Sequence, residues 1–149
     1  MSTITTEQAR TTKARPAAIG VLAGVVAAGC IAAFAHDWRE IAFSVVLLAV
    51  VTAVVFGVVV PRALRKESAG GTALALAIPA VLLAMPAFWS GLPLVLGLAG
   101  VIVGNAGRTA RTGAGKCIAA VVLGALAVVS YVAIHVMSGI LGEVGFLLN

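Results

Sequence analysis

The segment GNAGRTARTGAGKC, residues 104–117, ends in a glycine-lysine pair like the one that holds nucleotide phosphates in P-loop proteins. That motif reads G-x-x-x-x-G-K-[ST], so Ala110 stands where its first glycine belongs and Cys117 where its magnesium-binding hydroxyl belongs. The alternating strand and helix pattern of a nucleotide-binding domain is also missing from the surrounding sequence. The sequence therefore predicts no nucleotide site here, but a glycine-rich turn between two helices.

A second group of residues has side chains that could bind a metal. His36, Asp37, Glu40, His135 and Glu143 are all expected on one side of a membrane, and imidazole and carboxylate groups are zinc ligands. They are scattered along the chain without the spacing of a metal motif, so we interpret them as ordinary interfacial residues, with a metal site as the alternative. We expect no cofactor and no metal.

The composition shows where all these residues must lie. Of the 149 residues, 62% are hydrophobic and 10% are charged, whereas a soluble domain has roughly 25% charged residues. A soluble fold of this length could not bury so much apolar surface, so the solvent of most of the chain must be lipid. The net charge of +5 therefore indicates membrane sidedness and not nucleic acid. The partner that we expect first is the lipid bilayer.

Long uncharged runs predict an all-α integral membrane protein with a bundle of about five transmembrane helices. A helix needs about 20 apolar residues to cross the hydrocarbon core. The fourth run is the shortest and the least certain to span fully. The polar, Thr-rich segment 1–15 is expected to be disordered, and residues 142–149 to form a short outer tail. The membrane domain 16–141 would hold spans at 16–35, 41–60, 72–89, 93–107 and 117–141.

The basic residues predict the orientation of this bundle. With the N-terminus in the cytoplasm and the C-terminus outside, nine of the ten Lys and Arg residues fall on the inner side, as the positive-inside rule requires. Aromatic residues near the expected outer boundary agree with this orientation. The inner loops would be anchored at the head groups by Arg62, Arg65, Lys66, Arg108, Arg111 and Lys116.

The first span has an alternative interpretation. Its basic start, apolar run and Ala33-Phe34-Ala35 sequence resemble a signal peptide with a small-x-small cleavage site. The apolar run is longer than the 7–15 residues usual for a signal peptide, which favours a retained membrane anchor.

Prolines and small residues suggest how the helices fit together. Pro79 and Pro86, both in the third expected span, are hinge candidates, and a static kink is the simpler interpretation. Pairs of small residues four positions apart allow helices to approach closely, either within one chain or in an oligomer. These helix-packing candidates are Gly20, Gly24, Gly100, Gly104, Ala120 and Gly124.

The segment from about residue 72 to 140 resembles a known family. An apolar helix, LVLGLAGVIVG, ends in a turn that bears glycine and arginine, and the next helix contains Val122-Leu123-Gly124. These features are similar to the small bacterial membrane domain of unknown function 4190. The resemblance implies a compact helical domain in the bacterial plasma membrane, and it brings no established activity.

The expected function follows from abundant packing faces and the lack of an acid-base or nucleophile pair within the hydrocarbon. We expect no enzyme, but a structural or accessory subunit of a membrane complex, or a self-assembling bundle. The alternative is a transporter or channel component for a small neutral solute, suggested by the two prolines and by an Arg-x-x-Arg pattern repeated at 62–65 and 108–111. A lipid-modifying enzyme is a more distant possibility.

Overall fold

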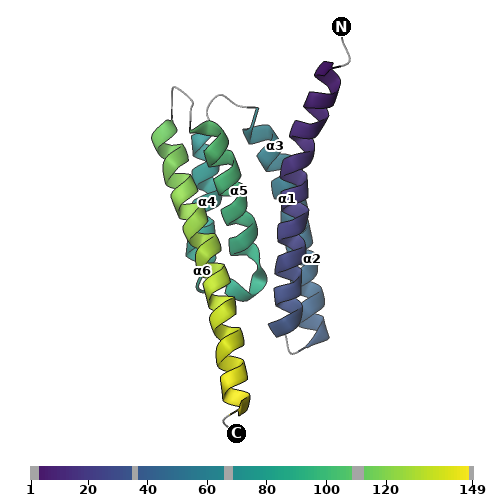
Figure 1. The fold of residues 1–149 in the computed structure, drawn as a ribbon, viewed down its shortest axis with the longest axis vertical. Coiled ribbons are helices and arrows are strands. Elements are labelled where there is room, and N and C mark those ends of the chain that lie inside the picture. Colours follow the sequence, from purple (N-terminus) through teal and green to yellow (C-terminus); the bar gives the residue numbers. More distant parts are fainter. Residues whose placement is uncertain (1–3, 35–36, 66–68, 109–112, 148–149) are drawn as a thin grey trace.

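The computed structural model describes residues 4–34, 37–65, 69–108 and 113–147, and every regular element in these ranges is helical. This confirms the all-α prediction. Figure 1 shows the helices running roughly along one long axis. The elements are α1 (Ile4–Phe34), α2 (Trp38–Val54), the π-helix η1 (Val55–Val59), α3 (Val60–Ala63), α4 (Gly70–Leu83), the 3-10 helix η2 (Phe88–Ser90), α5 (Leu92–Gly107) and α6 (Ala114–Leu147).

Three helical segments are long and apolar enough to cross a membrane. They are Pro16–Ala33, Trp38–Ala63 and Ala114–Gly139. The helices α4 and α5 have 14 and 16 residues, so they extend over only about 21 Å and about 24 Å at 1.5 Å per residue. Both are shorter than the roughly 30 Å of a hydrocarbon core.

The expected helix at 72–89 is wrong in its last six residues, 84–89. Helix α4 ends at Leu83, and the turn after it is closed by hydrogen bonds from the Ala84 N–H to the Val81 oxygen and from the Ala87 N–H to the Leu83 oxygen. Pro86, predicted as a hinge inside a helix, lies in this turn, because proline disfavours helical geometry in the residue before it. Pro79 does lie within α4.

The two expected tails also need correction. Residues 4–15, predicted to be disordered, belong to α1, and residues 142–147 continue α6 instead of forming a separate outer tail. A helix that is already nucleated gains a hydrogen bond for each residue added, so a long apolar helix extends easily into neighbouring polar sequence. Segment 4–15 contains no glycine and no proline that would interrupt it.

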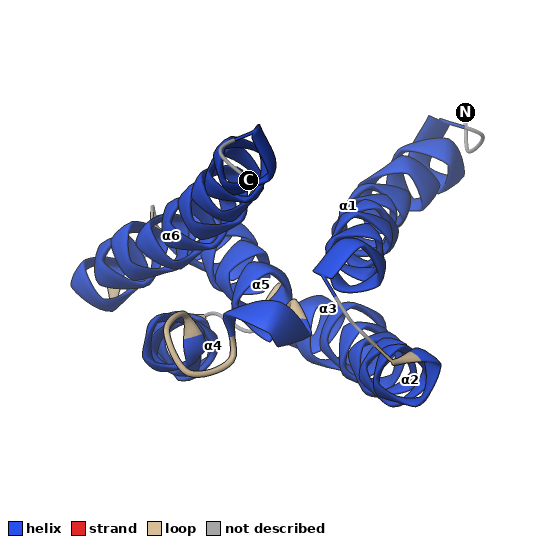
Figure 2. Ribbon diagram, turned by 90° about the horizontal axis from the view of Figure 1, so that it is seen from below, coloured by secondary structure: helices blue, strands red, loops and turns tan. Residues whose placement is uncertain are grey.

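The helices form two units that meet at α5. Helices α4, α5 and α6 pack extensively on one another, whereas α1, α2, η1 and α3 form a hairpin that touches the rest mainly through α5. Figure 2 shows this arrangement along the long axis, with α5 between the hairpin and the other two helices. Val95, Ala99 and Val103 of α5 are fully buried. The centre of the bundle is therefore filled by small and β-branched side chains.

The turn between η2 and α5 depends on Gly91. Its φ of 70° lies in the left-handed region, and a Cβ added there would lie 2.6 Å from the Ala27 Cβ. We expect Gly91→Ala to lower the free energy of unfolding by at least about 1–2 kcal/mol, the cost of a left-handed non-glycine residue. Thermal unfolding of the purified protein in detergent measures this effect. Gly71→Ala is the control, since a Cβ there meets no described atom within 4 Å, and an equal loss in both variants would contradict the prediction.

Candidate functional site

All six predicted small-residue positions lie at contacts within the chain. On α5, a Cβ at Gly104 would lie 2.7 Å from the Cys117 carbonyl oxygen of α6, and a Cβ at Gly100 would lie 3.1 Å from Ala77 of α4. Ala120 is fully buried, and a Cβ at Gly124 would lie 2.6 Å from the Gly97 carbonyl oxygen. The backbones of α5 and α6 thus approach as closely as only glycine allows.

The hairpin uses the remaining two positions. Gly20 on α1 faces the ring of Phe56, which is 4% exposed, and a Cβ at Gly24 would lie 3.5 Å from the methyl carbon of Thr52 on α2. The Phe56 ring thus occupies the space beside Gly20, whereas the space beside Gly24 would hold a Cβ in ordinary contact with Thr52.

Four of the six predicted basic anchors fall in the described residues. Arg62 and Arg65 are exposed at the end of α3, Arg108 is exposed after α5, and Lys116 is exposed in the first turn of α6. These helix ends lie together at one end of the molecule (Figure 1). Lys66 and Arg111 lie outside the described residues. The fold thus gathers these four basic residues at one end, while their role as anchors stays a prediction.

At the opposite end, the structure brings together polar residues that the sequence left scattered. A cavity of about 40 Å³ is lined by Glu40, Ser44, His135, Cys30 and aromatic and aliphatic neighbours. The His135 Nδ1 lies 2.9 Å from the Tyr131 carbonyl oxygen, within hydrogen-bond distance, and its ring meets Phe88 edge-on with the centroids 6.0 Å apart.

This cavity, which we call the His135 cavity, is too small for an organic substrate, although it could hold a water molecule. Among the described residues, no three His, Cys, Asp or Glu side chains are arranged to hold a metal ion. Asp37 instead caps α2 by accepting a hydrogen bond from the Arg39 N–H at 3.2 Å, and His36 lies outside the described residues. We therefore do not assign the His135 cavity as the functional site.

The larger spaces lie along the α1–α2 hairpin. The first, which we call the Thr52 groove, has a volume of about 310 Å³. Its floor carries small residues four positions apart on each helix, Gly24 and Ala28 on α1 and Ala49 and Ala53 on α2. The hydroxyl of Thr52 is buried and has no hydrogen-bond partner among the described residues. The remaining lining residues are Val21, Val25, Val45 and Leu48.

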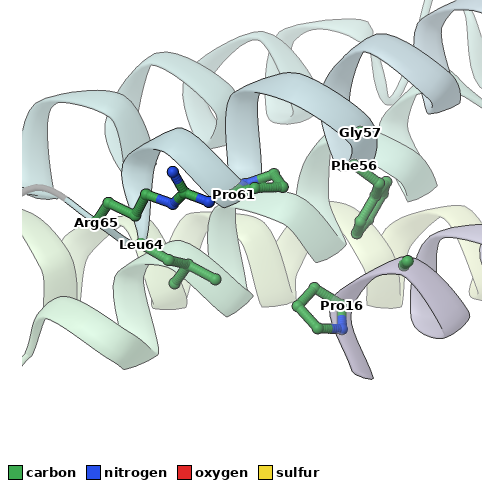
Figure 3. A pocket seen from close by; sticks show the side chains of 7 residues that line it. Pro16, Phe56, Gly57, Pro61, Leu64 and Arg65 are labelled. Carbon is green, nitrogen blue, oxygen red and sulfur yellow. The ribbon is translucent and has the colours of Figure 1, made fainter. Parts of the chain in front are cut away.

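The second space, which we call the Arg65 groove, has a volume of about 500 Å³. Its lining residues are Pro16, Ala17, Phe56, Gly57, Pro61, Leu64 and Arg65. In Figure 3, Phe56 and Leu64 point from the α2–α3 side toward α1, and Pro16 faces them. On α1, Gly20, which contacts Phe56, lies between Ala17 of the Arg65 groove and Val21 of the Thr52 groove.

The wall of the Arg65 groove is shaped by the π-helix η1. Proline lacks the N–H that a regular helix would need at position 61, and the Val60 N–H bonds to the carbonyl oxygen of Val55, five residues earlier. Such π-bulges occur frequently at functional sites. The prolines singled out in the sequence were Pro79 and Pro86, so the effect of Pro61 was missed.

Comparison of the chain with protein-family models, curated proteins and solved structures gives no match.

Proposed function

We propose that the protein is a structural or accessory subunit of a membrane complex, and that the Thr52 groove receives a transmembrane helix of another subunit. The observation that carries this proposal is the pattern of small residues four positions apart on both helices of an open, apolar groove. The same groove on two copies of the chain would give a self-assembling bundle.

The physics of association in lipid favours such an occupant. Apolar helices gain little from leaving lipid, so they associate through close packing and interhelical hydrogen bonds. The spacing of Gly24 and Ala28, and of Ala49 and Ala53, lets a third backbone approach.

The number of membrane spans and their orientation are part of the same proposal. We place all five apolar runs in the bacterial plasma membrane, with the N-terminus in the cytoplasm and the basic end of the bundle at the inner surface. Helices α4 and α5 would be held at membrane depth by their contacts with α6. The transporter alternative is less favoured, because Val95 and Val103 of α5 are fully buried at the centre of the bundle and Pro86, one of the two candidate hinges, lies outside a helix.

Native mass spectrometry after mild extraction from the native membrane tests this function. A defined heteromer would support the accessory role, a homo-oligomer would support self-assembly, and a bare 14.9 kDa chain would overturn both.

Substituting Ala49 links the assembly to the groove. We expect Ala49→Leu to weaken partner binding at least about tenfold, because overpacking a contact costs about 1–3 kcal/mol. The matched control is Ala42→Leu, an exposed position on the same helix that does not line the groove. The fraction of protein recovered with its partner is the measurement, and equal losses in both variants would contradict the role of the groove.

A further inference from the structure

The Arg65 groove combines an apolar wall with a cation at its rim. Among the described residues that line it, Arg65 is the one charged side chain, and Pro16, Phe56 and Leu64 supply the apolar surface. The guanidinium group lies on the α3 side of the groove, near Pro61 (Figure 3). No described carboxylate lines the groove. A ligand that fits both parts must therefore be apolar at one end and anionic at the other.

The position of Arg65 along the chain matches that of a lipid head group. The apolar segment Trp38–Ala63 ends two residues before Arg65, so the guanidinium stands where a membrane-spanning helix leaves the hydrocarbon. Arg62, one helical turn earlier, is also exposed. Guanidinium groups bind phosphate through two parallel hydrogen bonds, and basic sites at the membrane surface attract anionic lipids.

The groove is kept open at Gly57. A Cβ at this position would have no described atom within 4 Å, and the residue sits in the middle of the π-helix η1, whose altered turn shapes the wall. A larger side chain at residue 57 would occupy the groove without displacing the helix packing.

We propose that the Arg65 groove binds one acyl chain of an anionic phospholipid, with the lipid phosphate at the Arg65 guanidinium. The apolar wall holds the chain and the arginine selects the charge. This site is separate from the Thr52 groove, so lipid binding does not depend on the partner proposed above.

The test is a lipid titration of the full chain in mild detergent, followed by native mass spectrometry. Dioleoyl phosphatidylglycerol is compared with dioleoyl phosphatidylcholine, which has the same chains and no net charge. We expect Arg65→Gln to bind phosphatidylglycerol about fivefold more weakly, as about 1 kcal/mol per basic residue near an anionic surface implies. Gly57→Leu is expected to weaken both lipids by filling the groove.

Two controls make the result decisive. Arg39→Gln removes an exposed cation that does not line the groove, and Gly29→Leu adds the same side chain to an open position on α1. Both should bind as the unmodified chain does. Equal losses in Arg39→Gln and Arg65→Gln, or unchanged binding in Gly57→Leu, would overturn the site. Displacement of the lipid by inorganic phosphate would overturn the site too, since the acyl chain would then contribute nothing to the affinity.

Discussion

Replacing Gly124 with leucine is expected to produce a large loss of stability, by separating α5 from α6. The Cβ of the new residue would lie 2.6 Å from the Gly97 carbonyl oxygen and 3.0 Å from Val101 Cγ2. The first neighbour is backbone, which cannot rotate away as a side chain can. Overpacking of a core costs about 1–3 kcal/mol and occasionally more, and we expect a loss at or above the upper end of this range.

Thermal unfolding in detergent, followed by circular dichroism, measures the effect of Gly124→Leu. The matched control is Gly29→Leu, which makes the same substitution in a helix where a Cβ meets no described atom within 4 Å. The control should unfold close to the temperature of the unmodified chain. If Gly124→Leu also unfolded there, the close approach of α5 and α6 would be wrong.

The second large effect is expected at the contact between α1 and the hairpin's π-helix. A Cβ at Gly20 would lie 2.7 Å from the Phe56 Cβ and would overlap the ring, so Gly20→Leu should open the hairpin at this level. Phe56 is 4% exposed, and Phe56→Ala alone should cost about 3–5 kcal/mol by leaving a cavity. In the double variant, the new leucine fills the space that the ring leaves.

A double-mutant cycle separates this contact from general damage. We expect the double variant Gly20→Leu/Phe56→Ala to be more stable than the sum of the single effects predicts, by about 0.5–3 kcal/mol, the range for residues in contact. The cycle pairing Gly29→Leu with Phe56→Ala should be additive, because no described atom lies within 4 Å of a Cβ at Gly29. Additivity in the Gly20 cycle would show that the two residues do not meet.

The features that the sequence predicts correctly are those fixed by composition and spacing. The all-α class follows from the long uncharged runs, and Gly104 and Gly124 follow from pairs of small residues four positions apart. Gly97, which contacts Gly124, has no glycine, alanine or serine four positions away and so was not among the predicted pairs. It could have been found from the series of glycines at 97, 100, 104 and 107, whose spacing of three and four follows one side of a helix.

The features that were missed depend on contacts between distant parts of the chain. The run 72–89 is apolar throughout, so hydropathy could not indicate that the helix ends at Leu83. The Arg65 groove joins Pro16 of α1 to Leu64 after α3, and nothing local in either segment indicates the other. The same holds for Cys30 and His135, which share the His135 cavity although more than half of the chain separates them.

The close packing of α5 on α6 makes the reactivity of one cysteine a measure of how often these helices separate. Cys117 is 1% exposed, and its sulfur would lie 2.7 Å from a Cβ at Gly107, so a thiol-reactive reagent can reach it only after the two helices move apart. With Cys30, the other free cysteine in the described structure, replaced by serine, the labelling rate of Cys117 would report how often this opening occurs in an intact membrane. Ligands or partners that tighten the bundle would then be recognised by the slowing of that single reaction.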